Sequence, residues 1–162
     1  VRYGNVMASR GSVIPMFQDL ASRGEPLTIT DSRMTRFWIT LPQAVSFVVD
    51  RLGDMRGGEL FVPKLPSMKL VDMASVLAPE SPVEIVGIRP GEKLHEEMIS
   101  TEDARNTFRQ EDRFVVTPTL AEWGFVEPSG ERVADGFSYT SDKNDLWLSV
   151  EDLRSMLTGL NS

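Results

Sequence analysis

Apolar residues recur along the chain with two alternating spacings, one near two residues and one near 3.6 residues. Short apolar runs bounded by turn residues predict strands, and they lie at residues 1–6, 27–30, 36–40, 57–63 and 83–88. Several stretches between them carry apolar residues on one helical face. Because strands and helices of ordinary length alternate, the pattern predicts an α/β architecture with crossover connections.

The same pattern predicts four helices, over residues 12–24, 40–53 and 67–78 and from Ser149 onward. Each begins at a serine or threonine, whose side-chain oxygen can accept a hydrogen bond from the first helical turn. Thr40 has a glutamine and Ser149 an aspartate three residues on, so both are predicted to form reciprocal caps. The predicted apolar faces are, in order, Val13, Met16, Phe17 and Leu20; Val45, Val48, Val49 and Leu52; Leu70, Val71, Ala74, Leu77 and Ala78; and Val150, Leu153, Met156, Leu157 and Leu160.

Two stretches have a weaker pattern. The segment "RPGEKLHEEM", residues 89–98, reads as a turn that runs into a short helix. Residues 100–136 are predicted to form loops with one or two strands, one of them in "RFVVTP". The glycine-rich turn that binds dinucleotides between a first strand and its helix is missing, because the nearest cluster, "GDMRGG", follows a helix and reads as a plain turn.

Charge and composition narrow the possible partners. The 162 residues include 24 acidic and 17 basic side chains, a formal net charge of −7 that argues against a nucleic-acid partner. With no cysteine and a single histidine, His95, the chain cannot build a cysteine or histidine metal centre. No run of about 18 apolar residues is present, so the sequence predicts no membrane-spanning helix.

Four arginines lie in or beside predicted turns: Arg10, Arg33, Arg36 and Arg89. A guanidinium offers a planar fork of donors that matches phosphate oxygens, so these residues are candidates for binding a diphosphate. Surface salt bridges explain the same spacing and are the favoured interpretation from spacing alone. The diphosphate interpretation stays open beside it.

The "RPGEK" turn is a sharper candidate, because proline and glycine constrain the loop that carries Arg89 and Glu92. There a cation could meet phosphate and a carboxylate could accept ribose hydroxyls. Asn5 follows a predicted strand, and its amide could contact a phosphate or close a local Asx turn. His95 is interpreted as a solvated or hydrogen-bonded side chain.

Catalytic groups of familiar kinds are missing from the pattern. No serine lies with a histidine in a nucleophile motif, and "SRGS" is not the strained elbow of a hydrolase. Tyr139 and Lys143 have the Tyr-x-x-x-Lys spacing, but "YTSDKND" is turn chemistry, whereas an active pair must share a helix face. We interpret this pair as a coincidence.

Five segments carry a family resemblance: "RYGNVMASRGSVIPMF", "PLTITDSRMTRFWIT", "GGELFVPKLPSMKLVDMA", "IVGIRPGEKLHEEMIS" and "GFSYTSDKNDLWLSVEDLRSML". Together they resemble the carboxyl-terminal half of the inverting UDP-N-acetylglucosamine 4,6-dehydratases, extended short-chain dehydrogenase/reductases that supply sugars for bacterial capsule, lipopolysaccharide and glycans. The resemblance extends from Arg2 to Leu157. Its most specific parts are "MTRFWIT" and "IRPGEKLHE".

The resemblance implies a partial Rossmann-like fold, with the later sheet strands plus a small α/β substrate-binding domain. Residues 1–11 and 36–64 would belong to the Rossmann side, and residues 12–35 and 65–162 to the sugar-nucleotide domain. It implies NADP, bound mainly by an amino-terminal half that lies outside this chain. The catalytic Asp-Lys pair and Tyr-x-x-x-Lys of the family lie there too, so no catalytic residue and no metal ligand is assigned here.

The resemblance also assigns a set of substrate contacts for UDP-N-acetylglucosamine. Asn5 and Arg36 would face the diphosphate, and the Arg89–Glu92 loop would clasp the diphosphate and ribose. Tyr3 and Gly4 would lie beneath the nicotinamide. The other implied contacts are Arg10, Ser12 and Val13 at the entry to the uridine-binding helix, Thr28 and Thr30 at the uracil, and Met34 in the turn that closes over the nucleotide.

One position departs from the family, which commonly has glycine where Ala8 stands. If this position requires a positive φ, alanine strains the turn by about 1 kcal/mol. The chain also begins with valine rather than methionine, and we interpret it as the later half of a longer enzyme, inactive and poorly stable alone. Members of the family commonly form homo-oligomers in the cytoplasm, or at the inner membrane where upstream helices exist.

Three functions remain open at this point. The first is the substrate-binding half of the dehydratase. The second is a UDP-sugar C4 epimerase of the same superfamily, which would share the nucleotide contacts. The third is a non-catalytic module that binds UDP-sugars or mediates assembly.

Overall fold

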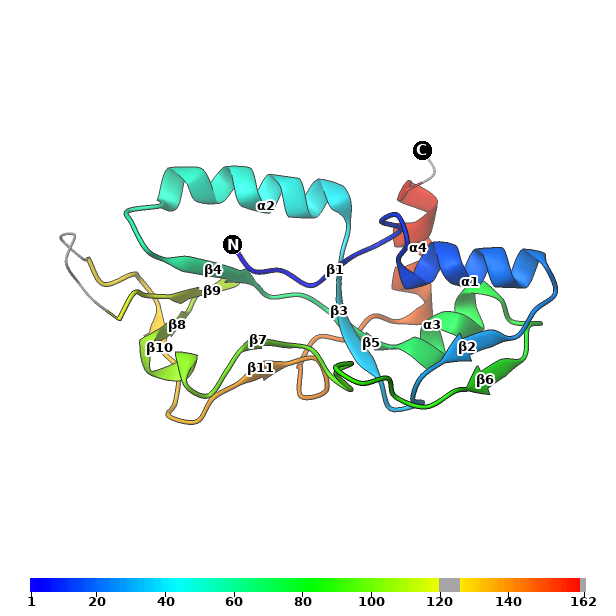
Figure 1. Cartoon of the computed structure of the whole chain (residues 1–162). Helices are drawn as coiled ribbons and strands as arrows, with labels where there is room; N and C mark the ends of the chain where they lie inside the picture. The colour runs from blue at the N-terminus through cyan, green and yellow to red at the C-terminus, as the bar shows by residue number, and fades with distance from the viewer. Residues whose placement is uncertain (120–125, 161–162) are drawn as a thin grey trace.

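The computed structural model describes residues 1–119 and 126–160, and its helices lie at the two ends of an elongated molecule (Figure 1). Helix α2 covers one end, and helices α1, α3 and α4 gather at the other. Their bounds are Val13–Ser22 for α1, Leu41–Asp54 for α2, Leu70–Leu77 for α3 and Val150–Leu160 for α4, with a 3₁₀ helix, η1, at Asp103–Asn106.

The predicted reciprocal caps are confirmed at two helices. The Thr40 amide donates to Gln43 Oε1 at 2.9 Å and the Gln43 amide donates to Thr40 Oγ at 3.4 Å, which starts α2. Before α4, the amides of Ser149 and Asp152 donate to each other's side chains at 2.9 and 3.1 Å. Ser12 precedes α1 as predicted, although its hydroxyl caps no amide.

The predicted cap at Ser67 is wrong. Ser67 is fully buried in strand β5, Ser67–Lys69, and α3 begins only after Lys69. Asn144 donates to the Ser67 hydroxyl at 3.0 Å, so this serine joins two distant segments. A serine before an apolar run is therefore ambiguous until the tertiary neighbours are known.

In the part of the chain that the structure describes, the strands are short and form four small sheets. The remaining strands are β1 Asn5–Val6, β2 Leu27–Ile29, β3 Thr35–Ile39, β4 Leu60–Pro63, β6 Val83–Ile85, β7 Glu97–Ile99, β8 Thr107–Arg109, β9 Arg113–Val116, β10 Glu131–Arg132 and β11 Tyr139–Thr140. The sheet orders are β1-β3-β5, β10-β8-β9-β4, β11-β7 and β2-β6. The pairs β1–β3 and β2–β6 are parallel and the others are antiparallel. The α/β prediction is thus confirmed, in a mixed form.

Strand β3 separates two hydrophobic cores. All five of its residues are buried, since alternate side chains point to opposite faces. Trp38 belongs to the core formed with α1, α3 and α4, which includes Phe17, Met73 and Leu153. Phe37 and Ile39 belong to the core formed with β4, β7 and β9. One strand therefore holds the two ends of the molecule together.

The second core groups the chain differently from the predicted domain division. Strand β4 pairs with β9, and β9 pairs with β8, so residues 98–116 and 133–139 pack with the predicted Rossmann-side segment. The predicted boundary between residues 64 and 65 does not follow this packing. The division into two domains stays a prediction.

Three local predictions need correction. Residues 1–6 form only a two-residue strand, although the Arg2 amide donates to the Phe61 carbonyl at 2.9 Å. Residues 89–98 form no helix, and end instead in strand β7. In the described part of residues 100–136 there are three strands and a 3₁₀ helix, where one or two strands were expected. Residues 120–125 lie outside the described part.

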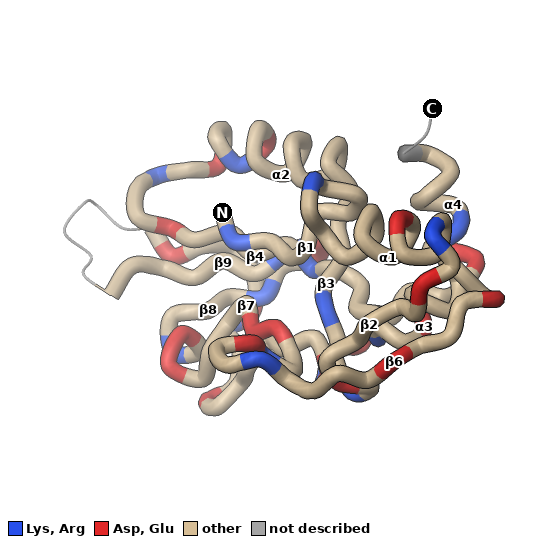
Figure 2. Tube along the Cα trace, turned by 45° about the vertical axis from the view of Figure 1, so that its right-hand side comes forward, with Lys and Arg blue, Asp and Glu red and all other residues tan. Residues whose placement is uncertain are grey.

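Within residues 1–119 and 126–160, no helix is both long enough and apolar enough to cross a membrane. In the same residues, no group of three or more histidine, aspartate or glutamate side chains is placed to hold a metal ion. Acidic and basic residues are interspersed along the chain trace (Figure 2).

Candidate functional site

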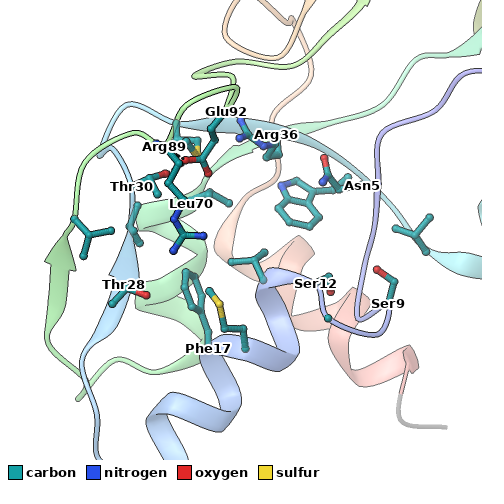
Figure 3. Close-up of a pocket in the computed structure, with 18 residues that line it drawn as sticks. Asn5, Ser9, Ser12, Phe17, Thr28, Thr30, Arg36, Leu70, Arg89 and Glu92 are labelled. Carbon is teal, nitrogen blue, oxygen red and sulfur yellow. Dashed lines mark hydrogen bonds between the residues drawn. The ribbon is translucent and has the colours of Figure 1, made fainter.

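A cavity of about 300 Å³ lies between α1, β2, β3 and the loop that follows β6 (Figure 3). It brings together residues that lie more than 80 positions apart in the sequence. Its lining includes all but one of the predicted substrate contacts, namely Asn5, Ser12, Val13, Thr28, Thr30, Met34, Arg36, Arg89 and Glu92. Arg10 is exposed and does not line this cavity.

The Arg89–Glu92 loop is a tight turn at the edge of the cavity. The Glu92 amide donates to the Arg89 carbonyl at 3.0 Å, Pro90 occupies the second position, and Gly91 has a φ of 82°. These are the features of a type II turn, in which the third residue needs a positive φ. The Arg89 amide also donates to the Glu92 carboxylate at 3.2 Å. The constrained turn predicted from "RPGEK" is confirmed.

Arg36 is buried and already committed to this loop. Its Nη1 donates to the carbonyls of Thr35 at 2.7 Å and Leu94 at 3.1 Å, and its Nη2 donates to Lys93 at 2.8 Å. Its Nε lies 3.4 Å from Glu96 Oε1. Most of the guanidinium fork therefore holds the backbone that follows the turn, and Arg36 acts mainly to position the loop.

The electrostatics of Arg36 follow from its burial. Burial lowers the pKa of the Arg36 guanidinium below its ordinary value, while the charges of Glu96 and Glu92 oppose that shift. Arginine remains protonated under all ordinary conditions. The carbonyls and carboxylates around it therefore compensate a permanent buried charge.

Arg89 differs from Arg36 in having a free guanidinium. Within the described residues its side chain makes no hydrogen bond or ion pair, and Figure 3 shows it extending from the loop toward the cavity. A charged fork without a protein partner at a cavity is suited to bind an anion such as a phosphate. Arg33, by contrast, forms a surface ion pair with Asp31 at 2.8 Å and lies outside the cavity.

Helix α1 points its amino terminus at the same cavity. Ser9, Gly11 and Ser12 line it just before the helix begins. The Ser12 hydroxyl is buried and has no hydrogen-bond partner among the described residues. Free amides and the helix dipole make a helix amino terminus attractive to anions. Arg89 and α1 thus approach the cavity from two sides (Figure 3).

The smaller contacts are arranged along β1 and β2. The side-chain amide of Asn5 makes no hydrogen bond with the described residues. It therefore does not close an Asx turn and remains available at the cavity. Thr28 and Thr30 line the opposite wall, and the Thr30 hydroxyl lies 3.5 Å from the sulfur of Met34. Polar groups at the edge of an apolar floor are typical of small-molecule sites.

Tyr3 and Gly4 line a different cavity of about 260 Å³, together with Glu96, Glu97 and Met98. An added Cβ at Gly4 would lie 2.6 Å from Phe37 Cβ, so the glycine is explained by close packing against β3. Tyr3 is 41% exposed. No buried, unpartnered side-chain atom marks a nicotinamide position at these two residues.

The turn between β1 and α1 is strained at Ala8, which has a φ of 55°. The left-handed region is unfavourable for a residue with a Cβ, by about 1 kcal/mol. The departure from the family's glycine therefore falls at a position where glycine fits better.

Tyr139 is a buried residue of β11 whose hydroxyl is held by backbone groups. Its phenol accepts from the Leu65 amide at 2.8 Å and donates to the Leu65 carbonyl at 3.1 Å. Burial raises the pKa of Tyr139 to about 12, which is opposite to the shift that an active tyrosine needs. The pair with Lys143 is a coincidence of spacing.

His95 is hydrogen-bonded, although not on a helix. Its Nδ1 lies 2.8 Å from the Thr35 hydroxyl, which in turn lies 2.7 Å from the Ser141 hydroxyl. This chain of contacts joins the end of the Arg89 loop to β3 and to residue 141. We assign it to the support of the loop.

Sequence reasoning missed Trp38, which is 1% exposed and lines the cavity. The sequence pattern predicts Trp38 only as part of the strand at residues 36–40. A usable signal existed, because Trp38 lies two residues after Arg36 and so faces the same side of the strand.

Comparison with known proteins agrees with this geometry. The polysaccharide biosynthesis protein family matches residues 1–118. The chain belongs to this family. It is 47% identical to the UDP-N-acetylglucosamine 4,6-dehydratase (inverting) of Campylobacter jejuni, over 96% of this chain and 49% of that protein. It is 35% identical to a UDP-glucose 4-epimerase of Rickettsia canadensis, over 99% of this chain and 49% of that protein.

The fold also matches a solved structure, the X-ray structure of Pen from Bacillus thuringiensis. The TM-score is 0.84 at 34% sequence identity, over 99% of this chain and 49% of that one. The chain spans about half the length of the curated relatives it matches. The predicted family and the predicted fold class are confirmed.

Proposed function

We propose that this chain is the substrate-binding, carboxyl-terminal half of an NADP-dependent, C5-inverting UDP-N-acetylglucosamine 4,6-dehydratase. The observation that carries the proposal is the cavity at which the free guanidinium of Arg89 and the amino terminus of α1 converge. Two features that attract anions at one small cavity suit a nucleoside diphosphate. The 47% identity to a dehydratase supports this substrate class.

The chain's own part in such an enzyme is to bind and orient. Arg36 fixes the backbone of the Arg89 loop, the loop presents Arg89 and Glu92, and β1 presents Asn5. NADP would supply the reversible oxidation of the sugar in the whole enzyme. Tyr3 and Gly4 give no structural sign of a nicotinamide, so we derive no step through it, and the choice of NADP stays a prediction.

The proposal is tested by calorimetry with this chain, using UDP and uridine as ligands. We expect UDP to bind. Arg89→Ala should weaken UDP by about 1.5–3 kcal/mol, roughly 10- to 150-fold, because it removes a hydrogen-bonded charge from the diphosphate. Uridine, which has no phosphate, should bind both forms equally.

The control for this experiment is Arg154→Ala on the exposed face of α4, which removes one positive charge away from the cavity. If Arg89→Ala and Arg154→Ala weaken UDP equally, the effect is net charge and the cavity is not the site. Failure of the wild-type chain to bind UDP, when circular dichroism shows that the chain is folded, would remove the proposed function. Arg10→Ala tests the predicted contact that does not line the cavity, and we expect it to resemble Arg154→Ala.

A second candidate, a UDP-sugar 4-epimerase, is favoured by the 35% identity to the Rickettsia canadensis protein. The two reactions differ in mass balance, since a dehydratase product lacks one water and an epimerase product has the mass of its substrate. Mass spectrometry of UDP-N-acetylglucosamine after incubation with the whole enzyme separates them. We expect the loss of water.

The remaining implications of the resemblance are part of the same proposal. They are a homo-oligomeric enzyme, a cytoplasmic location, and a role in capsule, lipopolysaccharide or glycan synthesis. Size-exclusion chromatography with light scattering on the whole enzyme tests the first of these, and a monomer would contradict it.

A further inference from the structure

The indole N–H of Trp38 is a buried donor that the fold leaves without a partner. Trp38 is 1% exposed, and its Nε1 makes no hydrogen bond with any described residue. Buried polar groups in native proteins almost always have a partner, so each exception requires an explanation. Trp147 is the matched contrast, because its Nε1 donates to the Asn144 carbonyl at 2.7 Å.

The position of Trp38 suggests what that partner is. Its Cα lies opposite Asn5 in the parallel pair of β1 and β3, and its side chain lies on the same face of β3 as Arg36. Trp38 lines the cavity that Arg89 also lines. The donor therefore belongs to a residue that borders the place where a ligand would lie.

A second polar atom in the same cavity lacks a partner. The buried Ser12 hydroxyl at the start of α1 makes no hydrogen bond within residues 1–119 and 126–160, although serine in this position usually caps its helix. Figure 3 shows Ser12 and Asn5 on the side of the cavity across from Arg89. Two unpartnered buried groups at one cavity point to a ligand that supplies acceptor oxygens between them.

We propose that Trp38 is a specificity-determining residue whose indole N–H donates to a phosphate oxygen of the bound ligand. The inference rests on the proposed function, because the ligand class is the nucleoside diphosphate proposed above. The Trp38 indole would be a neutral donor beside the charged guanidinium of Arg89. A search of the sequence for charged residues would not identify it. A neutral N–H in an apolar setting selects an acceptor oxygen by direction, which a flexible cation does not.

The proposal separates binding from folding in a testable way. Replacing a buried donor that has no partner by an apolar ring removes an unfavourable group from the free chain. If Trp38 served packing alone, truncating it would instead lower the free energy of unfolding and would change the affinities for UDP and uridine alike. Trp38→Phe keeps an aromatic ring and deletes the N–H.

The experiment measures UDP and uridine binding to the whole chain by calorimetry for wild type, Trp38→Phe and Trp147→Phe. We expect Trp38→Phe to weaken UDP by roughly tenfold or more, since hydrogen bonds to charged acceptors are strong, and to leave uridine unchanged. Trp147→Phe should bind both ligands like the wild type. Equal weakening of UDP and uridine by Trp38→Phe would assign Trp38 to packing and overturn the proposal.

A second measurement does not require the Trp38 variant to fold. In ¹⁵N-labelled wild-type chain, each tryptophan gives one indole N–H signal, and Trp147→Phe and Trp123→Phe assign the third to Trp38. Titration with UDP should move the Trp38 signal downfield, as expected for a new hydrogen bond, while uridine should not. An unmoved Trp38 signal at saturating UDP would overturn the proposal.

The outcomes distinguish this inference from the proposed function. If the wild-type chain binds no UDP, the proposed function fails and the inference fails with it. If UDP binds, and if its affinity falls in Arg89→Ala but not in Trp38→Phe, the proposed function stands and only this inference fails.

Discussion

Helices α1 and α2 are predicted by the same apolar spacing, yet they pack in opposite ways. In α1 the predicted face packs against a core: Phe17 is 0% exposed and Val13 and Leu20 are partly buried, although Met16 is 42% exposed. In α2 the predicted face is largely exposed, with Val49 at 58% and Leu52 at 66%. An apolar stripe therefore establishes that a helix is amphipathic, and it does not establish what covers the stripe.

The difference follows from what each helix has beside it. Helix α1 packs between β2 and α3 in the core that includes Phe17, Leu27 and Met73. Helix α2 turns other residues inward, and only Ala44 and Arg51 are buried. The Arg51 guanidinium lies 5.2 Å from the centre of the Phe47 ring. Within the described residues, the apolar face of α2 remains open to solvent.

The largest predicted effect tests this comparison directly. Phe17→Ala should lower the free energy of unfolding by about 3–5 kcal/mol, because it removes a fully buried aromatic ring and leaves a void in the core. Leu52→Ala should change it by no more than about 0.5 kcal/mol, because the side chain is exposed. Urea denaturation followed by circular dichroism measures both.

A milder substitution keeps the comparison measurable if Phe17→Ala unfolds the chain completely. Ile14→Val removes one methylene from the same core and should lower the free energy of unfolding by about 0.5–1.5 kcal/mol. Equal effects at Phe17 and Leu52 would contradict the contrast between the two helices.

The next effect concerns the two arginines of the cavity. Arg36→Ala should lower the free energy of unfolding by about 2–3 kcal/mol, because three backbone carbonyls lose a buried donor. Arg89→Ala should leave it within about 0.5 kcal/mol of the wild-type value, because its guanidinium has no protein partner. Thermal denaturation of the two variants separates a supporting arginine from a binding one, and a reversed order would refute the assignment.

A smaller effect, of opposite sign, is expected in the turn before α1. Ala8→Gly should raise the free energy of unfolding by up to about 1 kcal/mol, since glycine adopts a φ of 55° without strain. Ala21→Gly, within α1, is the matched control and should lower it by about 0.5–1 kcal/mol. If both substitutions destabilise, the strain at Ala8 is absent in solution.

The smallest effect is a dependence on pH in the turn between β2 and β3. Hydrogen bonds from the Arg33 side chain and backbone lower the pKa of Asp31 from 3.8 to about 2. The folded state therefore favours the ionised carboxylate, which contributes stability above pH 3.8 that is lost as the pH falls toward 2. The difference in stability between wild type and Asp31→Asn should be constant near neutral pH and shrink below pH 4. A difference that grows on acidification would contradict this sign.

The sequence was sufficient where the determinants are local. The caps at Thr40 and Ser149 and the turn at Arg89 depend on side chains within three or four residues, so their chemistry could be read directly. The family resemblance then named nine residues that line one cavity, and their contacts with a substrate stay a prediction. Pro90 and Gly91 favour the Arg89 turn because proline presets the φ of the second position and glycine adopts the positive φ of the third without strain.

Only the tertiary structure decided which polar side chains already have hydrogen-bond partners within the protein. The sequence presents Arg36 and Arg89 as equivalent cations beside turns, and the fold commits the first to carbonyls near residue 94 and leaves the second free. The same holds for Ser67, which is a buried strand residue, and for Trp38, whose donor has no partner. Hydrogen bonding and burial depend on neighbours far along the chain, and a one-dimensional pattern contains no information about those distances.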